Sequence, residues 1–237
     1  APLTNFGGGI GEGVHEKYED IIDAVDKHRN ATTTEEAANW RKEAERRLSV
    51  YRDDLNKKVL EEFHESGVEN ITITELEEQS PFHWVLEFAS VYATGGFDIV
   101  IGNPPWDKVK AERDDFFPQY DETFRTKMPE EKKEKQRKLL EQPKIAAKWE
   151  EYKNNIERKA EYFNSSSDYN LQETEIDGRK VSTENDLSAL FLERVFNLLN
   201  KDGYVSQVLP GVTFNGGSKK ALREHLLDET EMRALAI

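Results

Sequence analysis

The sequence has no cysteine among its 237 residues, so disulfide bonds and thiolate metal sites are excluded. It also has no apolar run near the roughly 20 residues that a transmembrane helix needs, and its N-terminus lacks the pattern of a signal peptide. We therefore expect a soluble, cytoplasmic protein that does not bind a membrane, and no metal site is predicted.

Basic charge is in short supply, since 33 lysines and arginines stand against 47 aspartates and glutamates, for a formal net charge of −14. This balance argues against a surface that coats nucleic acid nonspecifically. Residues 125–159 are the exception, because twelve basic and seven acidic residues give this segment +5 and leave −19 for the remainder. The segment is either the solvated face of a helix or an arm that contacts phosphates.

Glycines are concentrated near the N-terminus, where residues 5–13 read NFGGGIGEG. A loop that binds the phosphates of a cofactor should follow a buried strand, and residues 1–5 are too few and too polar to form one. We interpret the glycines as a flexible lead-in to a helix that has Tyr18, Ile21 and Val25 on one face.

A long amphipathic helix is predicted from a capping box at Thr33 and Glu36 to Ser66-Gly67. Its apolar face consists of Trp40, Ala44, Leu48, Tyr51, Leu55 and Val59. His28 and His64 lie in charged helical stretches, so we predict that they are surface residues rather than ligands.

The apolar period then changes. Aromatic and aliphatic residues alternate from Phe82 through Trp84 and Leu86 to Phe88, which predicts a half-buried strand. After two glycines, residues 97–101 (FDIVI) form an apolar run with β-branched residues, which is typical of a strand covered on both faces in a parallel sheet.

Residues 107–184 are polar and mostly helical in pattern, with a hairpin predicted around Asp177-Gly178, and we interpret them as an insertion in the sheet domain. A helix capped by Asn185 or Asp186 and ended by Gly203 follows. Its inward residues are predicted to be Leu187, Leu190, Phe191, Val195, Leu198 and Leu199. A strand at 204–210, a helix at 217–229 and the start of a strand at 232–237 complete a doubly wound α/β pattern.

Residues 103–106 (NPPW) follow the predicted strand 97–101 directly. Ligands bind at this edge of open α/β sheets, and two prolines leave the loop little conformational entropy to lose. The side-chain oxygen of Asn103 and the backbone oxygen of Pro104 offer two acceptors at a short spacing, which suits a planar amino group with two N–H donors. Trp106 offers a face on which a flat heterocycle can stack.

These residues carry a resemblance to a known family. The stretch 97–106 (FDIVIGNPPW) resembles the catalytic motif of S-adenosylmethionine-dependent DNA methyltransferases that modify the exocyclic N6 of adenine. The resemblance covers residues 81–106 and 185–227, and it is to large restriction–modification methylases and related phage-exclusion methylases. It implies a partial Rossmann-like methyltransferase sheet, with a helical N-terminal region at 1–75, a catalytic domain at 76–237 and a helical insertion at about 107–184.

Carried over to this sequence, the resemblance implies that Asn103 and Pro104 hold the adenine amino group while Pro105 fixes the loop. Trp106 would stack on the flipped base, which must first leave the duplex. Residues 208–210 and the loop through Phe214 and Asn215 would border the base pocket, with Phe214 either a second stacking wall or a core residue. Asp98 would lie at the start of the catalytic strand without an assigned chemical role.

Two parts of the family pattern are not found in the sequence. No strand with a Gly-rich turn precedes Phe97, so the residues that would bind S-adenosylmethionine are not identified, and the chain ends before a target-recognition domain. We therefore expect the catalytic-loop part of a larger enzyme that is inactive by itself and acts on DNA through the full-length protein. Its recognition sequence and oligomeric state are not predicted.

Two alternatives remain open. The same pair of acceptors would hold the amide of a protein glutamine or the amino group of an RNA guanine, so the methyltransferase could act on either. A non-catalytic docking module within a larger complex is the other possibility, and the missing cofactor motif supports it.

Overall fold

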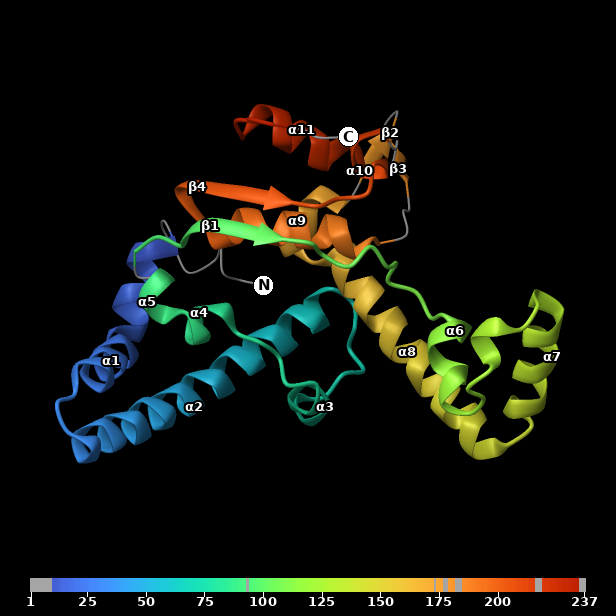
Figure 1. Cartoon of the computed structure of the whole chain (residues 1–237), viewed down its shortest axis with the longest axis horizontal. Helices are drawn as coiled ribbons and strands as arrows, with labels where there is room; N and C mark the ends of the chain where they lie inside the picture. Colours follow the sequence, from blue (N-terminus) through green and yellow to red (C-terminus); the bar gives the residue numbers. More distant parts are fainter. Residues whose placement is uncertain are drawn as a thin grey trace.

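The computed structural model describes residues 10–234, apart from residue 93, residue 173 and the segments 177–178, 182–184 and 216–218. Over these residues the protein is mixed α/β and mostly helical, with one parallel and one antiparallel strand pair (Figure 1). The glycines at 7–9 lie outside the described residues, so their interpretation as a lead-in stays a prediction.

The N-terminal region is a pair of packed helices, α1 (Ile10–Asn30) and α2 (Thr34–Glu65). The predicted N-terminus of α2 is confirmed, because the Thr33 hydroxyl accepts a hydrogen bond from the backbone N–H of Glu36 at 3.1 Å. The Glu36 carboxylate accepts from the backbone N–H of Thr32, also at 3.1 Å, so this second bond of the cap is made one residue early. The two histidines, His28 and His64, are exposed as predicted.

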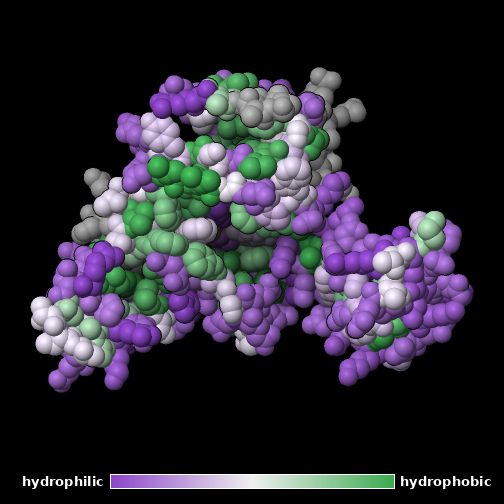
Figure 2. Space-filling model, viewed as in Figure 1, coloured by the Kyte–Doolittle hydropathy of each residue, from purple (hydrophilic) through white to green (hydrophobic). Residues whose placement is uncertain are grey.

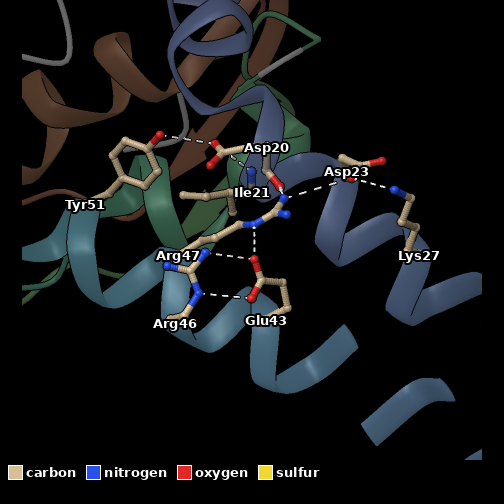
Figure 3. Close-up of polar contacts among 8 residues, drawn as sticks. All are labelled: Asp20, Ile21, Asp23, Lys27, Glu43, Arg46, Arg47 and Tyr51. Atoms are coloured by element: carbon tan, nitrogen blue, oxygen red, sulfur yellow. Dashed lines mark hydrogen bonds and ion pairs between the residues drawn. The ribbon is translucent and has the colours of Figure 1, made fainter. Parts of the chain in front are cut away.

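Polar contacts hold α1 against α2 (Figure 3). Arg47 donates to the Glu43 carboxylate at 2.8 Å and to the backbone oxygen of Asp20, and the Tyr51 hydroxyl donates to the Asp20 carboxylate at 3.2 Å. Hydrogen bonds from Arg46 and then Arg47 lower the pKa of Glu43 to about 2. These contacts are exposed, so we regard them as fixing the orientation of the helices more than their stability.

The segment predicted as a strand at 82–88 is helical, and this prediction is wrong. It forms α4 (Trp84–Glu87), which is followed by α5 (Ala89–Tyr92) and preceded by the capped helix α3 (Ile73–Glu78). The buried residues of this stretch are Val85, Leu86, Ala89 and Tyr92, a helical spacing, while Phe82 is 57% exposed. The alternating aromatics therefore do not mark the buried face.

Strand β1 (Phe97–Gly102) is confirmed, and it pairs in parallel with β4 (Leu199–Gln207). Gly96 precedes it at φ +118°, and a Cβ there would lie 2.7 Å from the backbone oxygen of Leu198, so only glycine fits. Helix α9 (Leu187–Leu198) ends at Leu198, five residues before the predicted stop at Gly203. Gly203 instead lies within β4, where a Cβ would be 2.8 Å from the backbone oxygen of Phe97.

The expectation that β1 is covered on both faces is wrong for the described residues, because Ile99 is 61% and Ile101 is 78% exposed. Helix α9 packs next to the strand pair (Figure 1), with Leu190, Val195 and Leu198 buried as predicted. The predicted inward residue Phe191 is 46% exposed. The described parallel sheet has two strands, which is one pair of the predicted doubly wound sheet. The Rossmann-like assignment therefore stays a prediction.

Most of the chain between β1 and α9 is helical, as predicted. Its elements are α6 (Arg113–Phe116), η1 (Phe117–Gln119), η2 (Phe124–Thr126), α7 (Pro129–Leu140), α8 (Pro143–Ser165) and η3 (Ser167–Gln172). We call α6 to α8, residues 113–165, the arm, because it projects from the rest of the molecule (Figure 1). The predicted hairpin is confirmed in its strands β2 (Thr174–Ile176) and β3 (Arg179–Val181), while its turn at 177–178 lies outside the described residues.

The C-terminal part contains α10 (Val212–Asn215) and the predicted helix α11 (Lys220–Asp228). Residues 232–234 are not in a strand, and residues 235–237 lie outside the described residues. A buried polar chain joins α11 to α9: Lys219 donates to Gln172 at 3.3 Å, and Gln172 donates to Glu193 at 2.7 Å. Burial raises the pKa of Glu193 and lowers that of Lys219.

Candidate active site

The loop of residues 103–106 leaves the end of β1 and is held on both sides. Before it, the backbone N–H of Val208 donates to the oxygen of Gly102 at 3.1 Å, which extends the pairing of β1 with β4. After it, Leu187 N–H donates to the oxygen of Asp107 at 2.9 Å and Val109 N–H to that of Asn185 at 2.8 Å. The loop is therefore fixed between a strand pair and the N-terminus of α9.

The predicted site residues differ in their surroundings. Asn103 and Pro105 are exposed and Pro104 is buried. The Trp106 ring is 52% exposed, and its Nε1–H donates to the backbone oxygen of Val208 at 3.3 Å. The indole is thus held at its edge by the segment 208–210, which the resemblance implies borders the base pocket, and part of its surface stays accessible to a ligand.

A cavity of about 630 Å³ opens beside this loop. Asn103, Pro104 and Pro105 line it, whereas Trp106 does not. Its other walls are mainly apolar side chains of α2, α4, β1 and α9, among them Leu55, Val59, Trp84, Val85, Val100, Leu190 and Val195. A cavity of this size and lining suits a flat, mostly apolar ligand held by few polar groups.

Two predicted residues are not brought to the cavity. Phe214 is half-buried and Asn215 is exposed, both on α10, and neither lines the cavity. Among the described residues no ring contact joins Phe214 to Trp106, so a role for Phe214 as a second stacking wall stays a prediction. Asp98 lies near the opposite end of β1, where it accepts a hydrogen bond from Asn200, and this is consistent with its lack of a chemical role.

Several polar residues of the cavity were not singled out by the sequence, among them His83, Arg194 and Gln207. His83 contacts Asn56, with 2.6 Å between the imidazole Nε2 and the amide Oδ1. Burial lowers the pKa of His83, and the nearby positive charge of Arg52 lowers it further. Arg194 donates to the Tyr169 hydroxyl at 2.9 Å with its guanidinium 5.1 Å from the centre of that ring.

Gln207 is the third. It faces Gly102 across the strand pair, and its side-chain Oε1 is buried without a hydrogen-bond partner among the described residues. A buried acceptor of this kind is unfavourable unless something donates to it. Gln207 therefore offers a further polar contact beside Asn103 to a ligand in the cavity.

The cavity does not fit S-adenosylmethionine. That molecule carries a positive sulfonium and an ammonium group, which carboxylates would stabilise. The ionisable side chains that line the cavity are those of Lys58, His83, Tyr169 and Arg194, and no carboxylate among the described residues joins them. The described residues that precede β1 form helices and turns without a strand.

The strand end, the proline-rich loop and the cavity thus lie together, and a comparison with known protein families gives the class of the protein. The family model described as Eco57I restriction-modification methylase matches residues 20–139 and 122–236. These matches span most of the chain, so the protein belongs to this family of restriction–modification methylases, whose substrate is DNA. No curated protein and no solved structure matches the sequence.

Among the described residues, no helix is both long enough and apolar enough to cross a membrane. The described part of the chain also contains no cluster of histidine and carboxylate side chains with the geometry of a metal site.

Proposed function

We propose that this chain holds the target base in an S-adenosylmethionine-dependent DNA methyltransferase that modifies N6 of adenine. The observation that carries the proposal is that Asn103 and Pro104 line an apolar cavity, on a loop fixed at both ends. Membership of a restriction–modification methylase family supports DNA as the substrate.

In this proposal the adenine amino group donates one hydrogen bond to Asn103 Oδ1 and the other to the backbone oxygen of Pro104. Two acceptors on one nitrogen favour its tetrahedral form and localise its lone pair, which makes the nitrogen a better nucleophile. Because the loop is held before and after these residues, the acceptors need little reorganisation when the base arrives. Trp106 lies outside the cavity lining, so its stacking on the flipped base stays a prediction that rests on its accessible ring surface.

The methyl donor is S-adenosylmethionine, bound by residues other than those that line the cavity. This chain's residues act on the acceptor amine only. Calorimetric titration of the chain with S-adenosylmethionine is expected to give no saturable heat from this cavity. Saturable binding that is lost on obstructing the cavity with Asn103→Trp would instead place the donor there.

The test of the function is the change Asn103→Ala in the natural protein. Removing one preorganised polar partner of a reacting group typically slows a reaction by 10²–10³-fold, and we expect a loss of about that size. The measurement is transfer of labelled methyl from S-adenosylmethionine to DNA, with the methylated base identified after digestion. Asn200→Ala, which changes an asparagine at the other end of the strand pair, is the matched control and should keep most of the activity.

Each alternative has its own outcome. Unchanged transfer by Asn103→Ala would refute the assigned role of the loop. If the labelled methyl group is found on a protein glutamine or an RNA guanine and not on DNA, that acceptor is the substrate in place of adenine. No transfer by the folded natural protein to any of the three would favour a docking module.

A further inference from the structure

The segment 107–185, which contains the arm, begins and ends at the candidate active site. The chain enters it just after Trp106 and returns at Asn185, and Lys108 forms an antiparallel bridge with Asp186 where the two segments meet. From this base the arm extends away from the strand pair (Figure 1). A long ligand with one unit in the cavity could therefore continue past the arm.

We call residues 116–149, which contain one buried apolar cluster, the head of the arm. The head is rigid enough to present side chains in fixed positions. Its core is formed by Phe116, Phe117, Phe124, Leu139, Ile145 and Trp149, each at most 8% exposed. Lys132 also pairs with Asp114, and Lys127 and Lys135 pair with the carboxylate of Asp121, at 3.1 and 3.2 Å. Such closed packing resists rearrangement.

The lysines of the arm fall into two groups. Lys133, Lys138 and Lys153 each pair with a glutamate three or four residues earlier on the same helix, at 2.7 to 2.8 Å. Lys144, Lys148 and Lys159 are exposed and have no ion-pair partner among the described residues. The second group can meet an anion without first breaking a contact.

The unpaired lysines share one row of α8. Lys144, Lys148, Asn155 and Lys159 follow one another at intervals of four, seven and four residues, which places them on one side of a helix. The adjacent row contains the buried residues Ile145 and Trp149, so packing fixes which side of α8 faces the solvent. At a rise of about 1.5 Å per residue, the row spans about 22 Å. We call these four residues the α8 row.

One acidic residue interrupts the row. Glu151 lies between Lys148 and Asn155 at the same helical spacing and is exposed. Its carboxylate would repel a phosphate, and this gives the row an internal test of opposite sign. Figure 2 shows that the arm is largely hydrophilic in this view, while hydrophobic side chains gather over the strand pair.

We propose that the α8 row binds the phosphate backbone of duplex DNA whose target base occupies the cavity beside Asn103. This inference rests on the proposed function for the nature of the substrate. Unpaired lysines on one side of a helix of an otherwise acidic protein attract a polyanion to this surface, and the remaining surface repels it. Lysine contacts to phosphates position a duplex without reading its sequence.

The experiment measures duplex binding by the chain as a function of salt concentration. In the variant K144Q/K148Q/K159Q, we expect the slope of log K against log salt to become shallower by about 2.7, since each lost phosphate contact removes about 0.9. The matched control is K133Q/K138Q/K153Q, which removes the same charge from the same arm. It should change the slope much less, because these lysines lie outside the row.

A third variant tests the sign. Glu151→Gln removes the repelling carboxylate, so we expect tighter binding at low salt. All seven substituted side chains lie on the surface of the arm, and circular dichroism should show unchanged folding for each variant.

Several results would overturn the inference: no duplex binding by the unsubstituted chain, equal slopes for the two triple variants, or binding of an acidic polypeptide in preference to DNA. Failure of the proposed function is distinguished by the methyl-transfer assay. If adenine is methylated but the salt slope of K144Q/K148Q/K159Q is unchanged, the proposed function stands and DNA binding by the α8 row is refuted. A shallower slope without adenine methylation leaves the row as a DNA-binding surface and refutes the function.

Discussion

In the head of the arm, six apolar side chains close a core of their own, whereas the strand pair β1–β4 leaves Ile99 and Ile101 largely exposed. The arm is thus a well-packed extension, and the candidate active site lies at the less completely packed strand pair. Binding sites are commonly drawn from the less stable parts of a fold, because they need groups that a ligand, rather than the protein, satisfies. Gln207, with its unpartnered buried oxygen, is such a group.

The largest effect expected from this comparison is on the arm. Phe117 is fully buried, so Phe117→Ala should cost about 3–5 kcal/mol and unfold the head. Hydrogen exchange should rise across α7 and the first half of α8 while α1 and α2 stay protected. Phe82→Ala, at a phenylalanine that is 57% exposed, is the control. Uniform loss of protection in both regions would show that the arm and the body unfold as one unit.

A smaller effect of opposite sign is expected at the strand pair. Gln207→Met keeps the approximate size of the side chain but removes the unpartnered oxygen, so unfolding by urea should need about 1 kcal/mol more. If Gln207 contacts the substrate, methyl transfer by the natural protein should fall at the same time. Lower stability would mean that the amide is well bonded in the folded protein, and the argument for a ligand contact would lose its basis.

The next effect depends on pH. Burial lowers the pKa of His83 below its usual 6.5, with Arg52 acting in the same direction and Glu87 against it. The unfolded chain therefore binds a proton at His83 more readily than the folded chain does. The contribution of neutral His83 to the free energy of unfolding is present above pH 6.5 and is lost as the pH falls through the lowered pKa. His83→Gln should flatten this part of the stability profile in urea titrations. An unchanged profile would assign the pH dependence to other groups.

The long helix could be predicted because its signals are local: Thr33 caps it, and an apolar row from Trp40 to Val59 marks its buried face. The same holds for β1 and the loop after it, where a β-branched run meets two prolines. The segment 82–88 could not be assigned correctly, because its alternating aromatic residues have the period of a strand. The residues that the fold buries there, Val85 and Leu86, are adjacent and do not follow that alternation.

The candidate site could be predicted where it is continuous in the chain. Asn103, Pro104 and Pro105 reach the cavity together because they are consecutive. His83 and Gln207 come from distant segments, so their meeting depends on tertiary packing that no short motif records. Phe214, predicted as either a second stacking wall or a core residue, lies on α10 after β4 and does not line the cavity.

The smallest effect is expected at the exposed face of β1, and it tests the comparison most directly. Ile101 is 78% exposed, so Ile101→Thr should change the free energy of unfolding by no more than about 0.5 kcal/mol. The matched variant Val195→Thr places the same hydroxyl at a residue of α9 that is 3% exposed, where an unpaired hydroxyl should cost about 1–3 kcal/mol. Both are measured by urea unfolding of the chain. A large loss at Ile101 would mean that this face is covered in solution, and the contrast between a closed arm and an open strand pair would then describe only the isolated chain.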